Sequence, residues 1–482
     1  MKEKFGGVEK KQGASRPFVA AIALLVAGAL VVLVWRAAPL LRIATGSVSS
    51  SVCAGVFISG LDPEQVYREE QLPNPGIAKL NWALRYTVDR ARREVSTTIL
   101  GRFRSRAVYR EGFGCHLVLG DSPLIIDRAI PPVAIPEVEG NVPPLVEAID
   151  PRLSPALDAA FAEIDPRGWR QTKAVVVLRD GKLIAERYAP GYGVNTAIWG
   201  HSLTKSVTNA LIGILVREGK LKVDEAAPVA AWQSPGDPRR GITLDQLLRM
   251  SSGLPPDETN DTITLATRMW FLEPDSVAFA ASQRLAAVPG TQWAYSNLGY
   301  ALLSGVVRDA AGDGEPGRTL AFIQKELFQP VGMQHATLEF DSAGTPEGNG
   351  FMFATARDWA RFGQLYLDDG LVQGRRILPE GWVKYSVRPT LDTGYGAGFW
   401  TNLKKDGEIP YWGIEWGLPS LPTDTYFGRG ALGQYIVVVP SKRVVVVRLG
   451  LSHDTSTGIG KLAASILETL ESEPGELPRS SQ

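Results

Sequence analysis

The sequence predicts an α+β domain whose single antiparallel sheet is completed by both ends of the domain, with a helical lobe inserted between them. Two pairs of β-rich runs indicate this arrangement: residues 173–188 surround an Asp-Gly turn, and residues 435–450 surround a short polar turn. Residues 150–164 and 461–471 have helix patterns beside these pairs. Mostly helical patterns and Gly/Pro-rich loops lie between them, which places helices in the middle of the domain.

The composition is that of a globular protein with a large core. The chain has 482 residues, of which 44% are hydrophobic, and this length suits one large domain or two to three smaller ones. Its 51 basic and 51 acidic residues give a formal net charge of zero. Because no basic run occurs beyond the N-terminus, we expect no nucleic-acid partner.

Residues 17–35 form an uninterrupted apolar segment. As a helix it is long enough to cross a hydrocarbon core of about 30 Å. Basic residues are more numerous before it than after it, so residues 1–16 are predicted to be a cytoplasmic tail. We expect a single-pass signal anchor in the inner membrane and a periplasmic catalytic domain. The alternatives are a cleaved signal, which Pro39 disfavours near the cleavage position, and a buried helix of a soluble protein.

A small membrane-proximal region is predicted over residues 36–129. Residues 85–100 show the alternation of a β-hairpin. The two cysteines of the chain, Cys53 and Cys115, both lie in this region. In an oxidising compartment they are expected to form a disulfide, and two buried free thiols are the alternative.

Proline spacing separates this region from the main domain. Five prolines occur within residues 130–145, so residues 130–153 are predicted to be a Pro-rich linker. The main domain is predicted over residues 154–472, and residues 473–482 are predicted to be a disordered tail.

The stretch GHSLTKSV, residues 200–207, holds the candidate nucleophile. Apolar residues at helical spacing start at Leu203, so Ser202 and Lys205 lie one turn apart on the same helix face. An ammonium in the first turn of a helix opposes the helix dipole and is partly desolvated, and both effects favour the neutral amine. A neutral Lys205 can accept the proton of Ser202. The alternative is that Ser202 is only a helix N-cap and Lys205 a surface residue.

A lipase-type triad is the other catalytic hypothesis for Ser202. It requires a glycine where Thr204 stands, a strand before the serine, and Asp and His partners later in the chain. His453 is the only plausible triad base. The histidines are scattered and show no ligand spacing, so neither a metal nor another cofactor is expected, and His201 is expected to be structural; the positions are 116, 201, 335 and 453.

A second motif, Tyr295-Ser296-Asn297, opens another apolar helix. The pattern S-x-x-K followed by Y-x-N resembles the serine β-lactamase and penicillin-binding-protein superfamily, in particular its class C-like branch. The segments GALGQY and TARDWARFG are most similar to 6-aminohexanoate-dimer hydrolase-type serine hydrolases. The resemblance covers roughly residues 155–472, and it implies the β-lactamase/transpeptidase-like fold.

The resemblance also implies a role for each motif residue. Ser202 would be the acylated nucleophile, Lys205 its base and Tyr295 the proton shuttle to the leaving group. Asn297 would support them through hydrogen bonds. These roles agree with the chemistry, because one group must activate the hydroxyl and another must protonate the departing amine. The oxyanion hole is expected to be formed by the backbone N–H groups of Ser202 and Gln434.

The chain departs from the superfamily pattern at the third motif. Where K-T-G or H-x-G is usual, this chain has Ala431-Leu432-Gly433, which lacks a cation. Arg429, two residues earlier, is the candidate substitute if the strand extends that far, and a solvent-exposed Arg429 is the alternative. Arg429 and Gly433 are therefore the substrate-binding candidates.

Together these observations predict a membrane-anchored serine hydrolase that forms an acyl-enzyme with a small amide or ester. Two alternatives stay open. One is a β-lactamase or a D-alanyl-D-alanine peptidase, which the missing cation of the third motif disfavours. The other is a non-catalytic penicillin-binding-like module, which an intact set of motif residues disfavours.

Overall fold

The computed structural model describes residues 16–119, 144–163, 170–404, 406–453 and 457–472, with side chains from residue 37 onward. The predicted C-terminal tail, most of the Pro-rich linker and all but the last residue of the predicted cytoplasmic tail lie outside these ranges.

A six-stranded antiparallel sheet forms the centre of the main domain, in the order β12-β15-β16-β17-β5-β6. Its strands are β5 (Thr172–Arg179), β6 (Lys182–Tyr188), β12 (Trp400–Thr401), β15 (Tyr426–Gly430), β16 (Gln434–Val439) and β17 (Val444–Gly450). β17 pairs with β5, and Val446 lies opposite Val177. The two ends of the domain therefore complete one sheet, as the sequence predicted.

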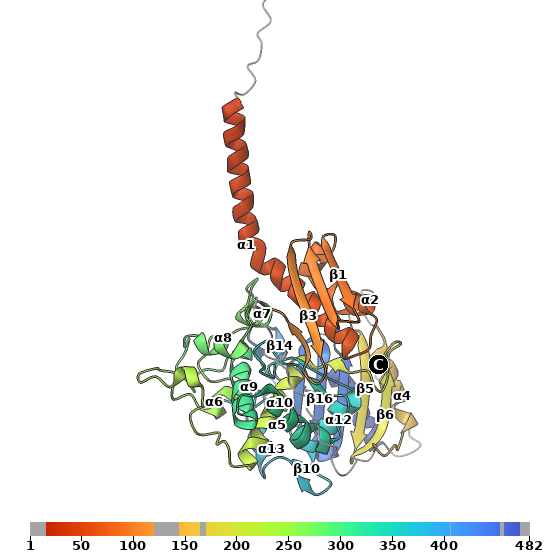
Figure 1. Cartoon of the computed structure of the whole chain (residues 1–482). Helices are drawn as coiled ribbons and strands as arrows, with labels where there is room; N and C mark the ends of the chain where they lie inside the picture. Colours follow the sequence, from red (N-terminus) through yellow and green to blue (C-terminus); the bar gives the residue numbers. More distant parts are fainter. Residues whose placement is uncertain (1–15, 120–143, 164–169, 405, 454–456, 473–482) are drawn as a thin grey trace, which may run out of the picture.

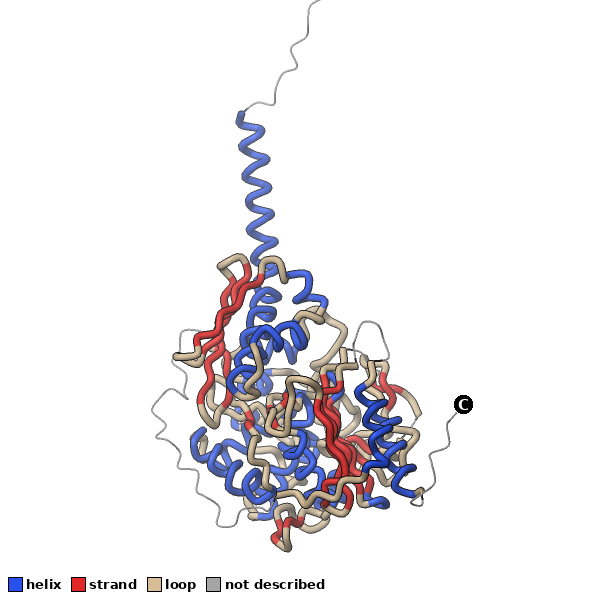
Figure 2. The backbone as a smooth tube through the Cα atoms, turned by 90° about the vertical axis from the view of Figure 1, so that its right-hand side faces the viewer, coloured by secondary structure: helices blue, strands red, loops and turns tan. Residues whose placement is uncertain are grey.

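Helices cover both faces of this sheet. Figure 2 shows one group of helices on one side of the central strands and the helical body on the other. α4 (Ser154–Phe161) and α14 (Ile459–Glu471) pack together, and α12 (Ala356–Leu367) packs on β5, β16 and β17. Because both faces are covered, β16 and β17 are buried along their whole length, which explains their continuous apolar runs.

The inserted lobe is helical, as predicted. Its main helices are α5 (Thr204–Arg217), α6 (Leu244–Leu248), α7 (Leu265–Leu272), α8 (Ser276–Ser282), α9 (Asn297–Gly312) and α10 (Pro316–Ile323). α9 packs against α5, α6, α8 and α10 and so lies at the centre of the lobe. The shorter elements are β7 (Ile198–Trp199), α11 (Gln329–Val331), β8 (Thr337–Leu338), β9 (Met352–Ala354), β10 (Leu371–Val372), β11 (Arg375–Arg376), α13 (Trp382–Ser386), β13 (Glu408–Ile409) and β14 (Ile414–Glu415).

The N-terminal domain is built on one long helix, α1 (Arg16–Phe57). Figure 1 shows its first part projecting away from the body and its last part beside the strands β1 and β3. The other elements of this domain are α2 (Pro63–Val66), α3 (Pro75–Leu80), β1 (Leu84–Asp89), β2 (Glu94–Ile99), β3 (Phe103–Arg110) and β4 (Gly114–Leu117). β1 to β4 form an antiparallel sheet in chain order, and β1 with β2 is the predicted hairpin.

Among the described residues, one helical segment, Ala37–Phe57, is long and apolar enough to cross a membrane. It is 67% buried, because Val48 and Val52 pack in a hydrophobic cluster with the β1–β4 sheet. This segment is therefore the core helix of the N-terminal domain. The predicted span, residues 17–35, forms the preceding part of the same helix, and the side chains of that part are outside the description.

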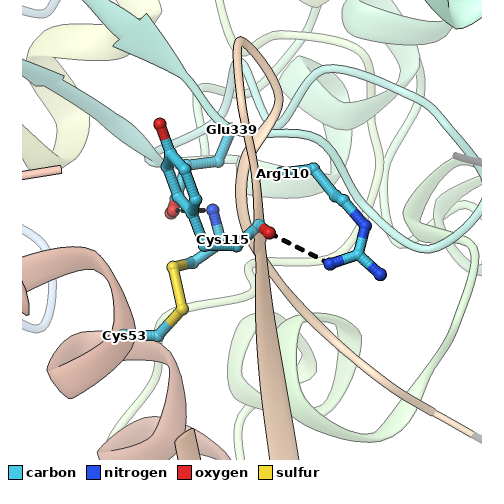
Figure 3. The surroundings of a disulfide bond; sticks show 5 residues. Cys53, Arg110, Cys115 and Glu339 are labelled. Carbon is cyan, nitrogen blue, oxygen red and sulfur yellow. Dashed lines mark hydrogen bonds between the residues drawn. A yellow bond between two sulfur atoms is a disulfide. The ribbon is translucent and has the colours of Figure 1, made fainter. Parts of the chain in front are cut away.

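A disulfide joins Cys53 of α1 to Cys115 of β4, with a Cα–Cα distance of 6.1 Å. Figure 3 shows the bridge and, beside it, Glu339 of the main domain. The backbone N–H of Cys115 donates to Glu339 Oε1 at 2.7 Å. The bridge thus ties the long helix to a strand that contacts the main domain.

We expect the disulfide to stabilise the N-terminal domain. It closes a loop with a sequence separation of 62 residues. Replacing both cysteines by serine should lower the free energy of unfolding by about 2–4 kcal/mol, because the unfolded chain gains freedom. Urea denaturation of the variant and of the wild type, each with and without reductant, measures this. Unchanged stability, or two titratable thiols in the unfolded wild type without reductant, would contradict the prediction.

Candidate active site

Ser202 lies in a 3-10 turn, His201–Leu203, that leads directly into α5. Gly200 connects β7 to this turn. Its N–H donates to Met352 O at 2.8 Å and so fixes the position of the turn. A side chain at position 200 would approach the Trp359 ring to 2.5 Å, so glycine permits this close packing. The hydroxyl of Ser202 is thereby presented at the start of a rigid, buried helix.

Lys205 meets Ser202 across the first turn, as the spacing predicted. Its Nζ lies 3.0 Å from Ser202 Oγ and 2.7 Å from Asn297 Oδ1, and it also donates to Asn349 O. The side chain is only 2% exposed. Burial lowers the pKa of Lys205 to about 8, although the carboxylates of Glu258 and Asp257 act in the opposite direction.

Tyr295 reaches the same hydroxyl from the other side. Its phenol donates to Ser202 Oγ at 2.7 Å, and Lys205 Nζ lies 4.8 Å from the centre of its ring. Burial, helped by the negative charge of Glu258, raises the pKa of Tyr295 well above its usual value. The phenol therefore keeps its proton at neutral pH and is available as a donor.

Asn297 connects this group to two carboxylates that the sequence analysis missed. Its Nδ2 donates to Asp257 Oδ1 at 2.9 Å and to Glu258 Oε1 at 2.8 Å. Asp257 also accepts from the N–H of Leu298 at 2.8 Å, and burial raises the pKa of Asp257 to about 7. The pair lies in a loop with no periodic pattern. Its only sequence signal is that it follows residues 242–254, a segment that resembles the superfamily.

Arg429 lines a cavity of about 220 Å³ together with Ser202, Tyr295 and Gly433. It is 8% exposed, its Nη1 donates to Glu415 O at 3.1 Å, and its guanidinium lies 5.2 Å from the Trp400 ring centre. The structure thus places Arg429 in the wall of the cavity and not on the solvent-exposed surface. Both substrate-binding candidates, Arg429 and Gly433, face the cavity that contains the candidate nucleophile.

Gln434, the expected second oxyanion donor, is not among the described residues that line this cavity, whereas Ala431 and Gly433 are. Gln434 is buried, and its side chain bonds to the backbone of Gly450. A side chain on Gly430 would lie 3.2 Å from the N atom of Ser202, so the backbone beside Ser202 is that of Gly430 and Ala431. The turn Ala431–Gly433, in which Leu432 has φ 58°, precedes β16, and Tyr435 of β16 also lines the cavity.

The two histidines near Ser202 do not serve it. His453 Nε2 is bonded to the backbone O of Glu69 at 2.9 Å, whereas the described hydrogen bonds of Ser202 Oγ go to Lys205 and Tyr295. His201 stacks on Trp199 with ring centres 3.9 Å apart. Burial lowers the pKa of His201 to about 3, so its ring is neutral. This arrangement disfavours the lipase-type triad.

The β-lactamase family model matches residues 157–461, so this chain belongs to the β-lactamase family. It is 24% identical to the 6-aminohexanoate-dimer hydrolase of Paenarthrobacter ureafaciens, over 59% of this chain and 74% of that protein. It is also 24% identical to the D-alanyl-D-alanine-carboxypeptidase/endopeptidase AmpH of Escherichia coli K12, over 55% of this chain and 75% of that protein.

Solved structures agree on the fold. A Bacillus anthracis protein provisionally assigned as a 6-aminohexanoate-dimer hydrolase superposes with a TM-score of 0.53 at 20% identity, covering 68% of this chain and 87% of that one. A family VIII carboxylesterase gives a TM-score of 0.52 at 15% identity, covering 66% and 98%. The resemblance found in the sequence is confirmed, and the chain is a serine hydrolase of this family.

The pKa of Lys205 predicts how acylation depends on pH. The amine accepts the serine proton only when neutral, so the second-order rate of labelling by a fluorophosphonate should rise with pH and level off above about 8. Glu258→Gln removes a negative charge that favours the ammonium, so the rise should move to lower pH.

Glu225→Gln is the matched control, because Glu225 forms an exposed ion pair with Lys222 away from the cavity. Its pH profile should coincide with that of the wild type. A Glu258→Gln profile that stays in place, or one that moves to higher pH, would contradict the assignment.

Proposed function

We propose that this protein is a membrane-anchored, extracytoplasmic serine hydrolase that acts through an acyl-enzyme on a small amide or ester. The observation that carries the proposal is the position of Ser202 Oγ, 3.0 Å from the amine of Lys205 and 2.7 Å from the phenol of Tyr295. One nucleophile thus has a base and an acid within hydrogen-bond distance.

The geometry supports the following acylation step. Neutral Lys205 takes the proton of Ser202 as Oγ attacks the substrate carbonyl carbon. The carbonyl oxygen becomes an oxyanion that accepts hydrogen bonds from the backbone N–H groups of Ser202 and Ala431. Tyr295 then donates its proton to the leaving amine or alkoxide as the bond to carbon breaks, and the ammonium of Lys205 restores the proton of the phenol.

Deacylation follows the same path with water as the nucleophile. Tyr295 and Lys205 together remove a proton from the attacking water, and Ser202 Oγ leaves with a proton when the ester bond breaks. Asn297 keeps Lys205 in place, and its bonds to Asp257 and Glu258 fix the orientation of its amide. These residues contribute positioning and charge, while Ser202, Lys205 and Tyr295 carry the reaction.

Two features support an amide substrate with a carboxylate. The name of the Paenarthrobacter ureafaciens relative, 6-aminohexanoate-dimer hydrolase, describes an amide substrate. In this chain, Arg429 places a buried guanidinium in the wall of the Ser202 cavity. A guanidinium binds carboxylates through paired, charge-assisted hydrogen bonds. We propose that Arg429 compensates for the cation missing from the third motif.

A D-alanyl-D-alanine peptidase is the second candidate, because such a substrate also ends in a carboxylate that Arg429 would bind. The E. coli relative AmpH carries this activity in its name. Turnover of D-alanyl peptides, β-lactams, short amides and p-nitrophenyl esters by the full-length protein separates these functions. Acylation without release would instead favour a binding module.

The proposed location rests on the N-terminal sequence and on the disulfide. Residues 17–35 are apolar with basic residues before them, and they continue into the helix that begins the N-terminal domain. The Cys53–Cys115 bridge suits an oxidising compartment. Both features support a cytoplasmic N-terminus and an extracytoplasmic active site.

Ser202→Ala should abolish labelling by a fluorophosphonate while the fold is kept, because the nucleophilic hydroxyl is removed. In-gel fluorescence measures labelling, and circular dichroism checks folding. Ser441→Ala is the matched control, since Ser441 lies in an exposed turn after β16. Unchanged labelling of a folded Ser202→Ala variant would refute the assignment.

Arg429→Gln should lower kcat/KM about tenfold to a hundredfold for an amide with a free carboxylate, because a charge-assisted hydrogen bond is lost. The same amide with its carboxylate methylated should be affected little. Arg375→Gln, which alters a half-exposed arginine paired with Glu326, is the control. An equal loss for both substrates would contradict carboxylate recognition by Arg429.

A further inference from the structure

A second, larger cavity of about 620 Å³ also opens beside Ser202, and two domains line it. The main domain contributes, among others, Trp199, Trp270 and Glu258. The N-terminal domain contributes Ser47, Glu70, Gln71, Pro73, Asn74 and Pro75. The catalytic steps described above involve none of these N-terminal residues.

We propose that the N-terminal domain forms the far wall of the substrate cleft and that this wall binds a cationic group of an extended substrate, next to Glu70. The inference rests on the proposed function, because it assumes that the carbonyl group to be attacked lies at Ser202. It adds a substrate class: amides or esters that carry an ammonium several bonds away from the bond to be cleaved.

The wall is fixed to the main domain through Glu69, the neighbour of Glu70. Lys173 Nζ lies 2.8 Å from Glu69 Oε2, and the Tyr192 hydroxyl donates to the same oxygen at 2.9 Å. The ring of His453 bonds to the backbone O of Glu69. Both the side chain and the backbone of Glu69 are therefore bonded to the main domain, so the wall has a defined position relative to Ser202.

A second attachment lies near the disulfide. Besides the bond from Cys115 to Glu339, the N–H of Phe340 donates to Phe113 O at 3.1 Å. The Ser342 hydroxyl donates to Leu117 O at 2.5 Å. The N-terminal domain is therefore joined to the main domain at Glu69 and near the disulfide, and α1 also packs against α7.

The charges around this cavity favour a cation. Among the described residues that line it, the ionisable side chains are the carboxyl groups of Glu70 and Glu258 and the imidazoles of His201 and His453, and no Lys or Arg is among them. Burial raises the pKa of Glu70 to about 7, and the negative charge of Glu69 contributes in the same direction. Lys173 is already engaged by Glu69. A bound cation would compensate the desolvated carboxylate.

Glu70 is also held in place for such contact. The Ser51 hydroxyl, on the buried part of α1, donates to Glu70 Oε2 at 2.5 Å. Gln71 beside it accepts from the Ser47 hydroxyl at 3.0 Å, so α1 supports both residues. The carboxylate is therefore oriented by the core of the N-terminal domain and is not a mobile surface group.

Aromatic side chains also line this cavity. They are Trp199, Trp270, Phe271 and Phe351, and the Trp199 and Trp270 ring centres lie 5.3 Å and 5.6 Å from that of Phe351. Aromatic faces bind both apolar chains and quaternary ammonium groups. The cavity thus suits a short apolar chain with a cationic end.

Two probes that differ only in charge test the proposal. The cationic probe is 5-(trimethylammonio)pentanamide, and 6,6-dimethylheptanamide is its neutral isostere. Full-length protein with Ser202→Ala should bind the cationic probe at least about tenfold more tightly, measured by calorimetry. Adding Glu70→Gln should remove about tenfold of this preference. Glu111→Gln, in an exposed ion pair of the same domain, should keep it.

A second pair of variants leaves Glu70 unchanged. Pro75 is exposed at the rim of the cavity, so changes there do not threaten folding. Pro75→Lys should weaken the preference for the cationic probe, and Pro75→Glu should strengthen it. Equal affinity for the two probes, or a preference that neither the Glu70 nor the Pro75 variants alter, would overturn the proposal.

These measurements do not depend on turnover, so they separate the two claims. If the proposed function is wrong, the Ser202→Ala variant will still be labelled by the fluorophosphonate, while the protein will still prefer the cationic probe. Failure of the cleft proposal would appear as the absence of charge preference in a protein whose Ser202 is still labelled.

Discussion

The site depends on the burial of one amine beside one hydroxyl. Lys205 is 2% exposed, and its Nζ lies 3.0 Å from Ser202 Oγ. Burial disfavours the ammonium, while Glu258 and Asp257 partly restore it, so the pKa settles at about 8. A fully exposed lysine would stay charged and could not accept the serine proton, and an amine without nearby carboxylates would be harder to hold in a buried position. The balance between burial and these carboxylates therefore sets the chemistry.

The fold supplies this balance by bringing distant segments together at the start of α5. Lys205 lies in the first turn of α5 and Ser202 in the 3-10 turn just before it. Asn297 begins α9, Tyr295 directly precedes that helix, and Arg429 lies at the end of β15. α5 is buried from Thr204 to Leu215, so its first turn has little freedom to move. The continuous sheet between the two ends of the domain fixes β15 against that turn. Catalytic groups on rigid elements keep their geometry without a cofactor to organise them.

Sequence reasoning succeeded where the signal is local. The two hairpins, α5 and the pairing of Ser202 with Lys205 follow from periodicity and spacing, and the motif at Tyr295 came from resemblance. Asp257 and Glu258 were missed because they lie in a loop and meet Asn297 across about 40 positions of the chain. The left-handed turn at Leu432 leaves no clear mark in the sequence, so Ala431 as the proposed second oxyanion donor could not be predicted from the motif. The sequence also could not predict that Glu70 lines a cavity together with Ser202, because only tertiary packing brings these residues together.

The N-terminal domain is proposed to contribute to both location and specificity, because the helix that continues from the predicted anchor also supports the cleft wall. The central claim is nevertheless the neutral amine at position 205. NMR titration of this lysine, with ¹³C-labelled side chains and assignment by Lys205→Met, measures that pKa directly. The account predicts a midpoint of about 8. A midpoint at the ordinary lysine value of about 10.4 would contradict it.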